Sequence, residues 1–339
     1  DDFSSIGLLV MGSGSVRTSG SNGRMLLSSQ SGISVLTPSV SDASIYGLKA
    51  SGTGSTITLK VPNNSAARSG IYIGNRVLAA AAFTMNSESN NFTADSFELD
   101  LAGSIEVASQ SISLSGVRDM DVKGDLISQQ GSVTVEAIGN LSLRNNVQAG
   151  ANVSLKAVGG NLTLMDVSHV DASGNITLEA SGNVLLDGPI GLITAPSSLV
   201  VSTTSGSIQA TAETSQLRSA VSIALTAPTI HVDGLLTTTG NTASPTDYEV
   251  QVNAANELRL TGRFTTAGSV LINSPVSPLI YNFTASQTGT NSRWKIATNG
   301  DLSLGRLVSN GSGGHVAEGV QIQAVNELLL DAATGIVTV

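Results

Sequence analysis

The chain has 339 residues, of which 40% are apolar, 3% aromatic and 12% charged, with a formal net charge of −9 and no cysteine. An average soluble domain has about 25% charged residues, so this chain carries few charges for its length. Nucleic acids and anionic membranes are bound by clustered cations. A chain with net negative charge is therefore disfavoured as a partner of either. The lack of cysteine excludes disulfides and thiolate chemistry, and no apolar stretch approaches the roughly 20 residues of a membrane-spanning helix.

The first part of the chain, residues 1–95, alternates short apolar runs with glycine- and serine-rich segments. The run "IGLLVMG" (6–12) has the length of a strand, and the segments 12–24 and 61–75 have the composition of loops. In this part, "VLAAAAFTM" (77–85) is compatible with one helical turn at most. We expect loosely repeated strands here.

One short phrase is repeated between residues 96 and 262. It occurs as "GSVTVEAIGNLSLRN" (131–145), "ANVSLKAVGGNLTLMD" (151–166) and "GNITLEASGNVLLDG" (174–188), and its apolar residues alternate with polar ones, as in a strand with one buried face. Two interleaved series recur at steps of 20 to 24 residues. The first series is Val133, Val153, Ile176, Leu199 and Ile223, and the second is Leu141, Leu162, Val184, Ile208 and Ile230.

This period predicts an all-β fold, a parallel β-solenoid (β-helix) with coils of about 20–24 residues. We expect one elongated solenoid over residues 1–339, most regular at 96–262, with looser, loop-bearing coils at 1–95 and 263–339. Inward Leu, Val and Ile would form continuous ladders between coils about 4.8 Å apart. An antiparallel β-sandwich is the alternative.

The quoted repeats resemble those of filamentous-haemagglutinin-type exoproteins of two-partner secretion. The segment "GSIQATAETSQLRSAVSIALTAPTIHVDG" (206–234) is, more weakly, similar to the β-helical ectodomain of sarcoglycans. Both resemblances imply an extracellular or cell-surface β-helix. The first implies an adhesin or fibre, although the Asn-Pro motifs of that family's secretion domain do not occur in this sequence.

Carboxylates are the first candidates for chemistry, because parallel β-helices also host polysaccharide-cleaving enzymes that use them. Asp119, Asp121 and Asp125 lie in "RDMDVKGD", where Asp119 and Asp121 would both point outward beside Arg118 and Lys123. A solvated strand face of mixed charge is the interpretation that we prefer, and weak Ca²⁺ binding or catalysis are the alternatives. The sequence therefore predicts no catalytic site, no cofactor and no enzyme activity.

The three histidines are far apart in the sequence, at His169, His231 and His315. His231 stands between two inward positions, Ile230 and Val232, and should therefore face solvent. We expect no histidine-based metal site.

The ends of a solenoid expose unpaired strand edges unless a cap covers them. Apolar residues occur close to both ends of this chain, so we expect them to mediate head-to-tail contacts. The alternative is that the 339 residues are a piece of a longer solenoid whose caps lie elsewhere. The candidates for assembly are Ile6, Leu8, Val10, Leu328, Leu330, Ile336, Val337 and Val339.

Eight Asn-x-Ser/Thr sequons would be glycosylation sites in a eukaryotic secretory host. They are Asn63, Asn91, Asn140, Asn152, Asn161, Asn175, Asn282 and Asn310. Three functions follow from these features. The first is a structural subunit of an extracellular or cell-surface filament, whose partners are other copies of itself. The alternatives are an adhesin segment that binds a host surface or glycan through loops, and a β-helical carbohydrate-active enzyme.

Overall fold

The computed structural model consists of β-strands and turns, with no helix among the described residues. These residues are 8–10, 16–29, 32–36, 46–60, 69–86, 94–99, 104–165, 169–191, 198–211, 215–240, 248–289, 292–309, 315–324 and 327–338. Contacts group the chain into two compact units, Asp1–Gly174 and Asn175–Val339, and each is described by itself.

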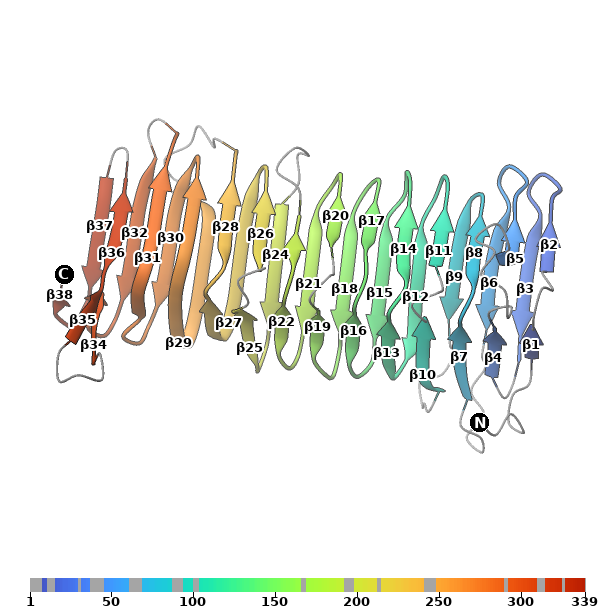
Figure 1. The fold of residues 1–339 in the computed structure, drawn as a ribbon, viewed down its shortest axis with the longest axis horizontal. Coiled ribbons are helices and arrows are strands. Elements are labelled where there is room, and N and C mark those ends of the chain that lie inside the picture. Colours follow the sequence, from blue (N-terminus) through green and yellow to red (C-terminus); the bar gives the residue numbers. More distant parts are fainter. Residues whose placement is uncertain are drawn as a thin grey trace. The chain divides into compact units, whose positions relative to one another are not determined.

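The first unit is built from three parallel sheets through which the chain passes in turn. In Figure 1, strands of the same sheet run side by side in successive coils. The β1 sheet contains β1 (Leu8–Val10), β4 (Gly32–Val35), β7 (Ser69–Ile73), β10 (Ala94–Leu99), β13 (Asp119–Val122), β16 (Leu141–Leu143) and β19 (Leu162–Leu164). The β2 sheet contains β2 (Val16–Thr18), β5 (Tyr46–Ala50), β8 (Arg76–Ala79), β11 (Ser104–Val107), β14 (Asp125–Ser128), β17 (Val147–Ala149) and β20 (Val170–Ala172). The β3 sheet contains β3 (Arg24–Ser28), β6 (Thr56–Lys60), β9 (Ala82–Asn86), β12 (Ile112–Val117), β15 (Val133–Ala137) and β18 (Val153–Ala157).

The second unit has the same plan, but some strands bend from one sheet into the next. The β21 sheet contains β21 (Ile176–Ala180), β24 (Ser198–Thr203), parts of β27 (Ser222–Val232) and β29 (Tyr248–Thr266), then β30 (Ser269–Ser274), β32 (Arg293–Thr298) and β37 (Glu327–Ala332). The β22 sheet contains β22 (Val184–Leu186), β25 (Ser207–Ala210), parts of β27, β29 and β31 (Leu279–Gln287), then β33 (Leu302–Leu304) and β38 (Val337–Thr338). The β23 sheet contains β23 (Pro189–Ile190), β26 (Gln216–Ser219), β28 (Leu235–Thr238), parts of β29 and β31, and β36 (Val320–Gln323).

The predicted register is confirmed within each unit. Val133 pairs with Val153 and Leu141 with Leu162 in the first unit, 20 (133 to 153) and 21 (141 to 162) residues apart. In the second unit, Leu199 pairs with both Ile176 and Ile223. The parallel β-solenoid is therefore shown.

Coils near the start of the chain are longer than predicted. Ile33 pairs with Ile71, which is 38 residues further on (33 to 71). A sheet register depends only on the strands, so residues added at a corner between strands lengthen a coil without disturbing the ladder.

The antiparallel alternative is wrong for the described strands, with one local exception. All sheet pairings above are parallel, and only β34 (Arg306–Ser309) and β35 (His315–Glu318) form an antiparallel hairpin. The helical turn considered for residues 77–85 is also wrong. Val77 and Phe83 lie in β8 and β9, where pairing with neighbouring coils overrides the helix propensity of the alanines between them.

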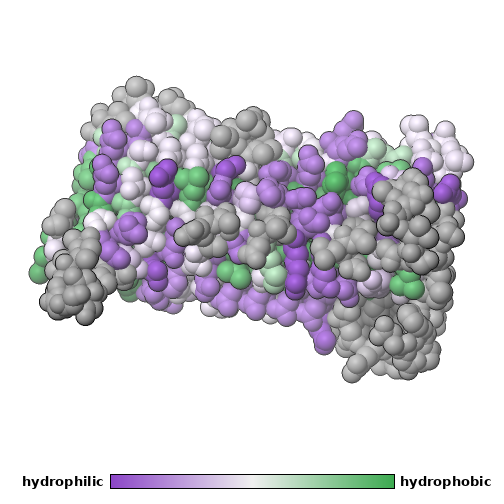
Figure 2. All heavy atoms as spheres, in the orientation of Figure 1, coloured by the Kyte–Doolittle hydropathy of each residue, from purple (hydrophilic) through white to green (hydrophobic). Residues whose placement is uncertain are grey.

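The core of each unit is made by inward side chains in ladders. On β15, Val133, Val135 and Ala137 are buried, whereas the intervening Thr134 and Glu136 are exposed. The outer surface visible in Figure 2 is accordingly mostly hydrophilic or neutral. Full burial of each Val, Leu or Ile contributes about 1.5–3 kcal/mol, so the stability of a coil depends on having a neighbour on both sides.

Glycine is required where the chain passes closest to the next coil. A Cβ on Gly131 would lie 1.8 Å from the carbonyl oxygen of Gln110. This explains why a glycine opens the repeat phrase at 131. The single continuous solenoid over residues 1–339 stays a prediction.

Candidate functional site

The acidic triplet faces outward, as predicted, and its carboxylates bind neighbouring coils. Asp119 Oδ1 accepts hydrogen bonds from the backbone N–H and the Nδ2 of Asn140, at 2.8 and 3.0 Å. Asp119 Oδ2 also lies 3.3 Å from Nε of Arg118. This carboxylate therefore stabilises the coil that follows it.

The other two aspartates have similar structural contacts. Asp125 Oδ1 accepts hydrogen bonds from the backbone and side chain of Asn146, at 3.2 and 3.1 Å. Asp121 lies 3.4 Å from Nζ of Lys123 and 3.9 Å from Nε of Arg144. A hydrogen bond to a further carboxylate, that of Glu98, raises the pKa of Lys123. These contacts account for all three aspartates as parts of the outer surface.

The asparagine of the repeat phrase connects coils at a corner. Asn140 Oδ1 accepts a hydrogen bond from the backbone N–H of Asn161, at 3.0 Å, one coil further on. In the second unit, Asn175 Oδ1 accepts from Ser198 N (3.1 Å) and Asn183 Oδ1 from Ser207 N (2.9 Å). The asparagines of the Gly-Asn pairs therefore form hydrogen bonds between coils at the corner, in addition to the role of these pairs in turns.

The sequons divide into those that the structure describes and those that it does not. The exposed, described asparagines are Asn140, Asn152, Asn161, Asn175 and Asn282. Asn63, Asn91 and Asn310 lie outside the described residues. Their glycosylation stays a prediction.

His231 faces outward, as predicted, and its Nε2 lies 2.9 Å from Oε1 of Glu257. His169 is exposed, and His315 lies in β35, where side chains are outside the described residues. Within the described ranges, no group of three or more His, Asp or Glu residues could hold a metal ion.

The predicted assembly residues occur in the first strand of one unit and the last strands of the other. Leu8 and Val10 are in β1, which pairs with β4 on one edge; their side chains are not described. Leu328 and Leu330 are in β37, Val337 is in β38, and Ile336 directly precedes β38. Ile6 and Val339 lie outside the described residues.

The last coil, formed by β36, β37 and β38, leaves inward side chains uncovered. Leu328 is 42% exposed, whereas its register partner Trp294 in the preceding coil is 0% exposed. Val337 is 40% exposed, whereas its partner Leu302 is buried. Leu330, Val320 and Ile322 are also half-exposed at inward positions. Among the described strands, nothing pairs with the outer edges of β36, β37 and β38.

The first coil, formed by β1, β2 and β3, also has a strand edge without a described partner. Each of its strands pairs with one neighbour only, in the next coil. Leu26 on β3 is 60% exposed, and the adjacent Leu27 is half-exposed although its partner Leu59 is fully buried. Leu26 is in register with the outward Thr58 and therefore lies on the outer face. Sequence reasoning missed Val320 and Ile322, because their exposure depends on which coils are stacked.

A buried carboxyl that the sequence did not reveal lies at a corner of the second unit. Glu249 is fully buried at a bulge in β29, and a Cβ on Gly268 would come within 2.0 Å of its Oε2. Neither carboxyl oxygen has a well-formed hydrogen bond among the described residues. Burial raises the pKa of Glu249 to about 7, and the nearby Thr238 hydroxyl and backbone N–H groups of Gly268 and Ala267 oppose this rise only in part.

The fold places the chain in the class of parallel β-solenoids. The aspartates and asparagines described above hold neighbouring coils together. No protein-family model matches the chain, and no curated protein or solved structure is significantly similar to it. Its described residues also include no helix that is long and apolar enough to cross a membrane.

Proposed function

We propose that the chain is a structural subunit of an extracellular or cell-surface filament that assembles end to end through its terminal coils. The observation that supports this is the uncovered last coil. Its inward Leu328, Leu330 and Val337 occupy positions that are fully buried in the coil beneath.

The occupant of this surface is the first coil of a second copy. The edges of β36, β37 and β38 present N–H and C=O groups in the arrangement that every internal coil uses for parallel pairing. The edges of β1, β2 and β3 present the complementary set. Stacking one on the other would bury the inward leucines of both coils and continue the ladders.

Such a contact joins two different surfaces of the same molecule. A heterologous contact of this kind does not close on itself, so repetition produces a filament. The extracellular setting is supported by the resemblance of the repeat phrase to surface-exposed β-helical fibres. The polar, weakly charged outer surface is compatible with that setting.

The test compares two leucines on the same strand. Leu328 and Leu329 are equally exposed, at 42%, but Leu328 is in register with the inward Trp294 and Leu329 with the outward Lys295. In electron microscopy and sedimentation at rising concentration, wild type and Leu329→Lys should form filaments. Leu328→Lys should remain dispersed, because its charge would be buried in the contact.

Circular dichroism of both variants shows whether the β-structure is retained. Dispersed wild-type molecules at every concentration would contradict the proposal. Equal behaviour of the two lysine variants would also contradict it, because the contact would then not involve the inward face of the coil.

A further inference from the structure

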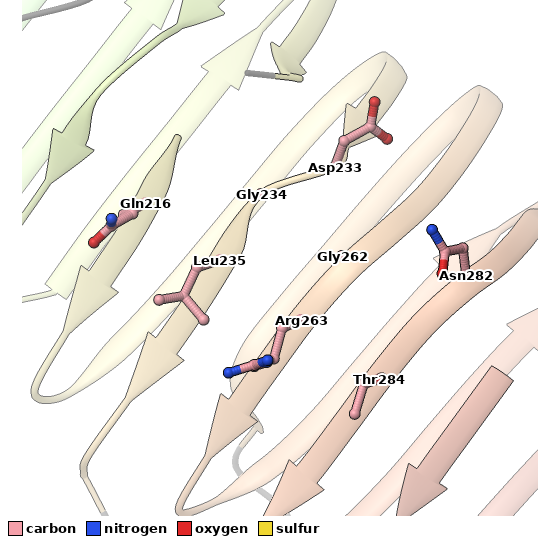
Figure 3. Close-up of a pocket in the computed structure, with 8 residues that line it drawn as sticks. All are labelled: Gln216, Asp233, Gly234, Leu235, Gly262, Arg263, Asn282 and Thr284. Carbon is pink, nitrogen blue, oxygen red and sulfur yellow. The ribbon is translucent and has the colours of Figure 1, made fainter. Parts of the chain in front are cut away.

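An open groove of about 470 Å³ lies within the second unit, at the corner between the β22 and β23 sheets. Four consecutive coils contribute to it, through β26, β28, β29 and β31. In Figure 3, Gln216, Leu235, Arg263 and Thr284 lie in a row across neighbouring strands, with Asp233 and Asn282 beside the corner. The row follows the register of the sheet, in which each of these residues pairs with the next.

Two glycines of adjacent coils, Gly234 and Gly262, line the groove at the corner. Gly262 has a φ of +87°, and a Cβ there would lie 2.4 Å from the carbonyl oxygen of Asp233. At Gly234 a Cβ would lie 2.2 Å from the carbonyl oxygen of Ser215. Both positions therefore require glycine, because the backbone passes so close to the preceding coil that a side chain would clash with it.

The lining is polar and rich in hydrogen-bonding groups. It offers the amides of Gln216 and Asn282, the hydroxyl of Thr284, the guanidinium of Arg263 and the carboxylate of Asp233. Leu235 is the one apolar side chain that the described lining contains. This set can donate to and accept from many hydroxyl groups at once.

The charge of the groove is opposite to that of the whole chain. Asp233 already accepts a hydrogen bond from the Thr261 hydroxyl and lies 3.5 Å from Nη2 of Arg259, so its charge is balanced. The Arg263 side chain is exposed, and no hydrogen bond or ion pair of its guanidinium is found among the described residues. It is thus an available cation in a protein of net charge −9.

The β23 sheet beside the groove has no acidic side chain at the described outward positions of the strands named next. The described outward residues of β26, β28, β36 and of the parts of β29 and β31 in the β23 sheet include no Asp or Glu. They are Gln216, Arg218, Leu235, Thr237, Arg263, Thr265, Thr284, Ser286, Gln321 and Gln323. An anion that approaches this face therefore meets cations and hydroxyl groups, and the one carboxylate of the described lining, Asp233, is paired with Arg259 and Thr261.

We infer that this groove binds an acidic oligosaccharide, with a uronic-acid carboxylate on the Arg263 guanidinium and sugar hydroxyl groups on Asn282, Gln216 and Thr284. A planar guanidinium binds a carboxylate through two parallel hydrogen bonds. Leu235 supplies an apolar surface for one face of a sugar ring. An acidic peptide fits less well, because the backbone groups of these strands are already paired in the sheet and the lining offers one apolar contact.

The site goes beyond a role in filaments and is tested on dilute, unassembled protein. The probes are tetramers of galacturonic, glucuronic and mannuronic acid, with the methyl ester of each as the uncharged control. Isothermal titration calorimetry should show binding of at least one acid, weakened about tenfold or more by esterification, as expected when a charge-assisted bond is lost.

Three variants locate the site. Arg263→Gln and Thr284→Val should each weaken binding, the first by about tenfold. Asn282→Gly keeps a residue that tolerates the positive φ of 48° and should also weaken binding. Arg144→Gln, an exposed arginine of the other unit, is the matched control and should bind like wild type. Binding of none of the acids, equal binding of acid and ester, or unchanged binding by Arg263→Gln would each overturn the inference.

Discussion

Asn140 links three successive coils through one amide group. Its Nδ2 donates to Asp119 in the coil before it, and its Oδ1 accepts from the backbone N–H of Asn161 in the coil after it. A side chain that satisfies backbone donors at a corner does for a solenoid what a capping residue does for a helix. The asparagine of the repeat is therefore explained by structure, whether or not its sequon carries a glycan.

Replacing Asn140 by alanine should lower the free energy of unfolding. The change removes both hydrogen bonds at an exposed corner, where water replaces them in part, so we expect a loss of about 1 kcal/mol. Denaturant unfolding followed by circular dichroism measures it. Gln148→Ala, an exposed change on β17, should stay within about 0.5 kcal/mol of wild type. If Gln148→Ala lost as much unfolding free energy as Asn140→Ala, the hydrogen bonds of Asn140 would not be the cause of the loss.

Glu249 makes the second unit sensitive to pH. Its pKa rises from the usual 4.5 to about 7 in the folded state, so the folded protein holds a proton that the unfolded chain releases. The stability from this group is fully present below pH 4.5 and decreases as the pH rises towards 7. Above that, the buried carboxylate is charged and the loss is complete.

Unfolding free energies measured from pH 4.5 to 8 should therefore fall with rising pH by on the order of 2–3 kcal/mol in wild type. Glu249→Gln keeps the shape of the side chain but cannot ionise, so its profile should lack this decrease. Glu136→Gln, on an exposed position of β15, should keep the wild-type profile. A wild-type profile that is flat over this range would contradict the burial of Glu249 as a proton-binding group.

At the scale of the strands, an aromatic cluster joins three successive coils of the second unit. The Phe264 and Phe283 rings are 4.9 Å apart, and Trp294 lies 6.3 and 6.2 Å from them. They come from β29, β31 and β32 and are all nearly or fully buried. The chain has 3% aromatic residues, and this cluster places two of them, Phe283 and Trp294, directly beneath the exposed last coil.

Phe264→Ala should destabilise the second unit by about 3–5 kcal/mol, because it leaves a cavity between rigid ladders. Trp294 is the only tryptophan of the chain, so its fluorescence reports unfolding at this place. Thr265→Ala, on the outward neighbouring position of the same strand, should cost less than about 1 kcal/mol. Equal losses would mean that the cluster does not support the packing of these coils.

The strands of the regular repeats could be predicted from sequence because each coil repeats one alternation. Val133 and Val153 stand at equivalent points of the phrase, and the structure pairs them. The segment 77–85 was harder, because four consecutive alanines carry no alternation. There the decisive information is the register with Ile57 and Ile105, in neighbouring coils.

The candidate site could be predicted only in part, for two physical reasons. Leu328 and Leu330 followed from the apolar pattern of the last strand, whereas the exposure of Val320 depends on the absence of a covering coil among the described residues. Alternation in "YEVQV" places Glu249 outward, but the bulge between Tyr248 and Val250 buries it. A bulge shifts side chains to the other face and leaves no clear signal in composition.

At the scale of the whole molecule, two effects oppose each other in the proposed assembly. The apolar contact between copies favours association, and the net charge of −9 on every copy opposes it. Like-charged copies repel each other over about 10 Å at 0.1 M salt and over shorter distances at higher salt. The apolar contact itself is not screened.

Filament formation should therefore become easier as sodium chloride rises from about 0.01 to 0.5 M, a range over which the screening length falls from about 30 to below 10 Å. Light scattering at fixed protein concentration follows the effect, and the Leu328→Lys variant should remain dispersed throughout. Assembly that dissolves on adding salt would instead indicate a contact held by ion pairs, contrary to the apolar last coil.

The short spacing between paired residues has a consequence for folding kinetics. Partners such as Val133 and Val153, or Leu141 and Leu162, are 20 or 21 positions apart, about 6% of the 339 residues. All-β domains with distant partners reach about 16–22% on the same relative scale and fold slowly for that reason. In this chain each coil can pair with its predecessor as a template, and its inward side chains are fully buried once the following coil stacks on it. We therefore expect folding to advance from coil to coil, so that a segment leaving the ribosome or a secretion pore can be folded before the rest has followed.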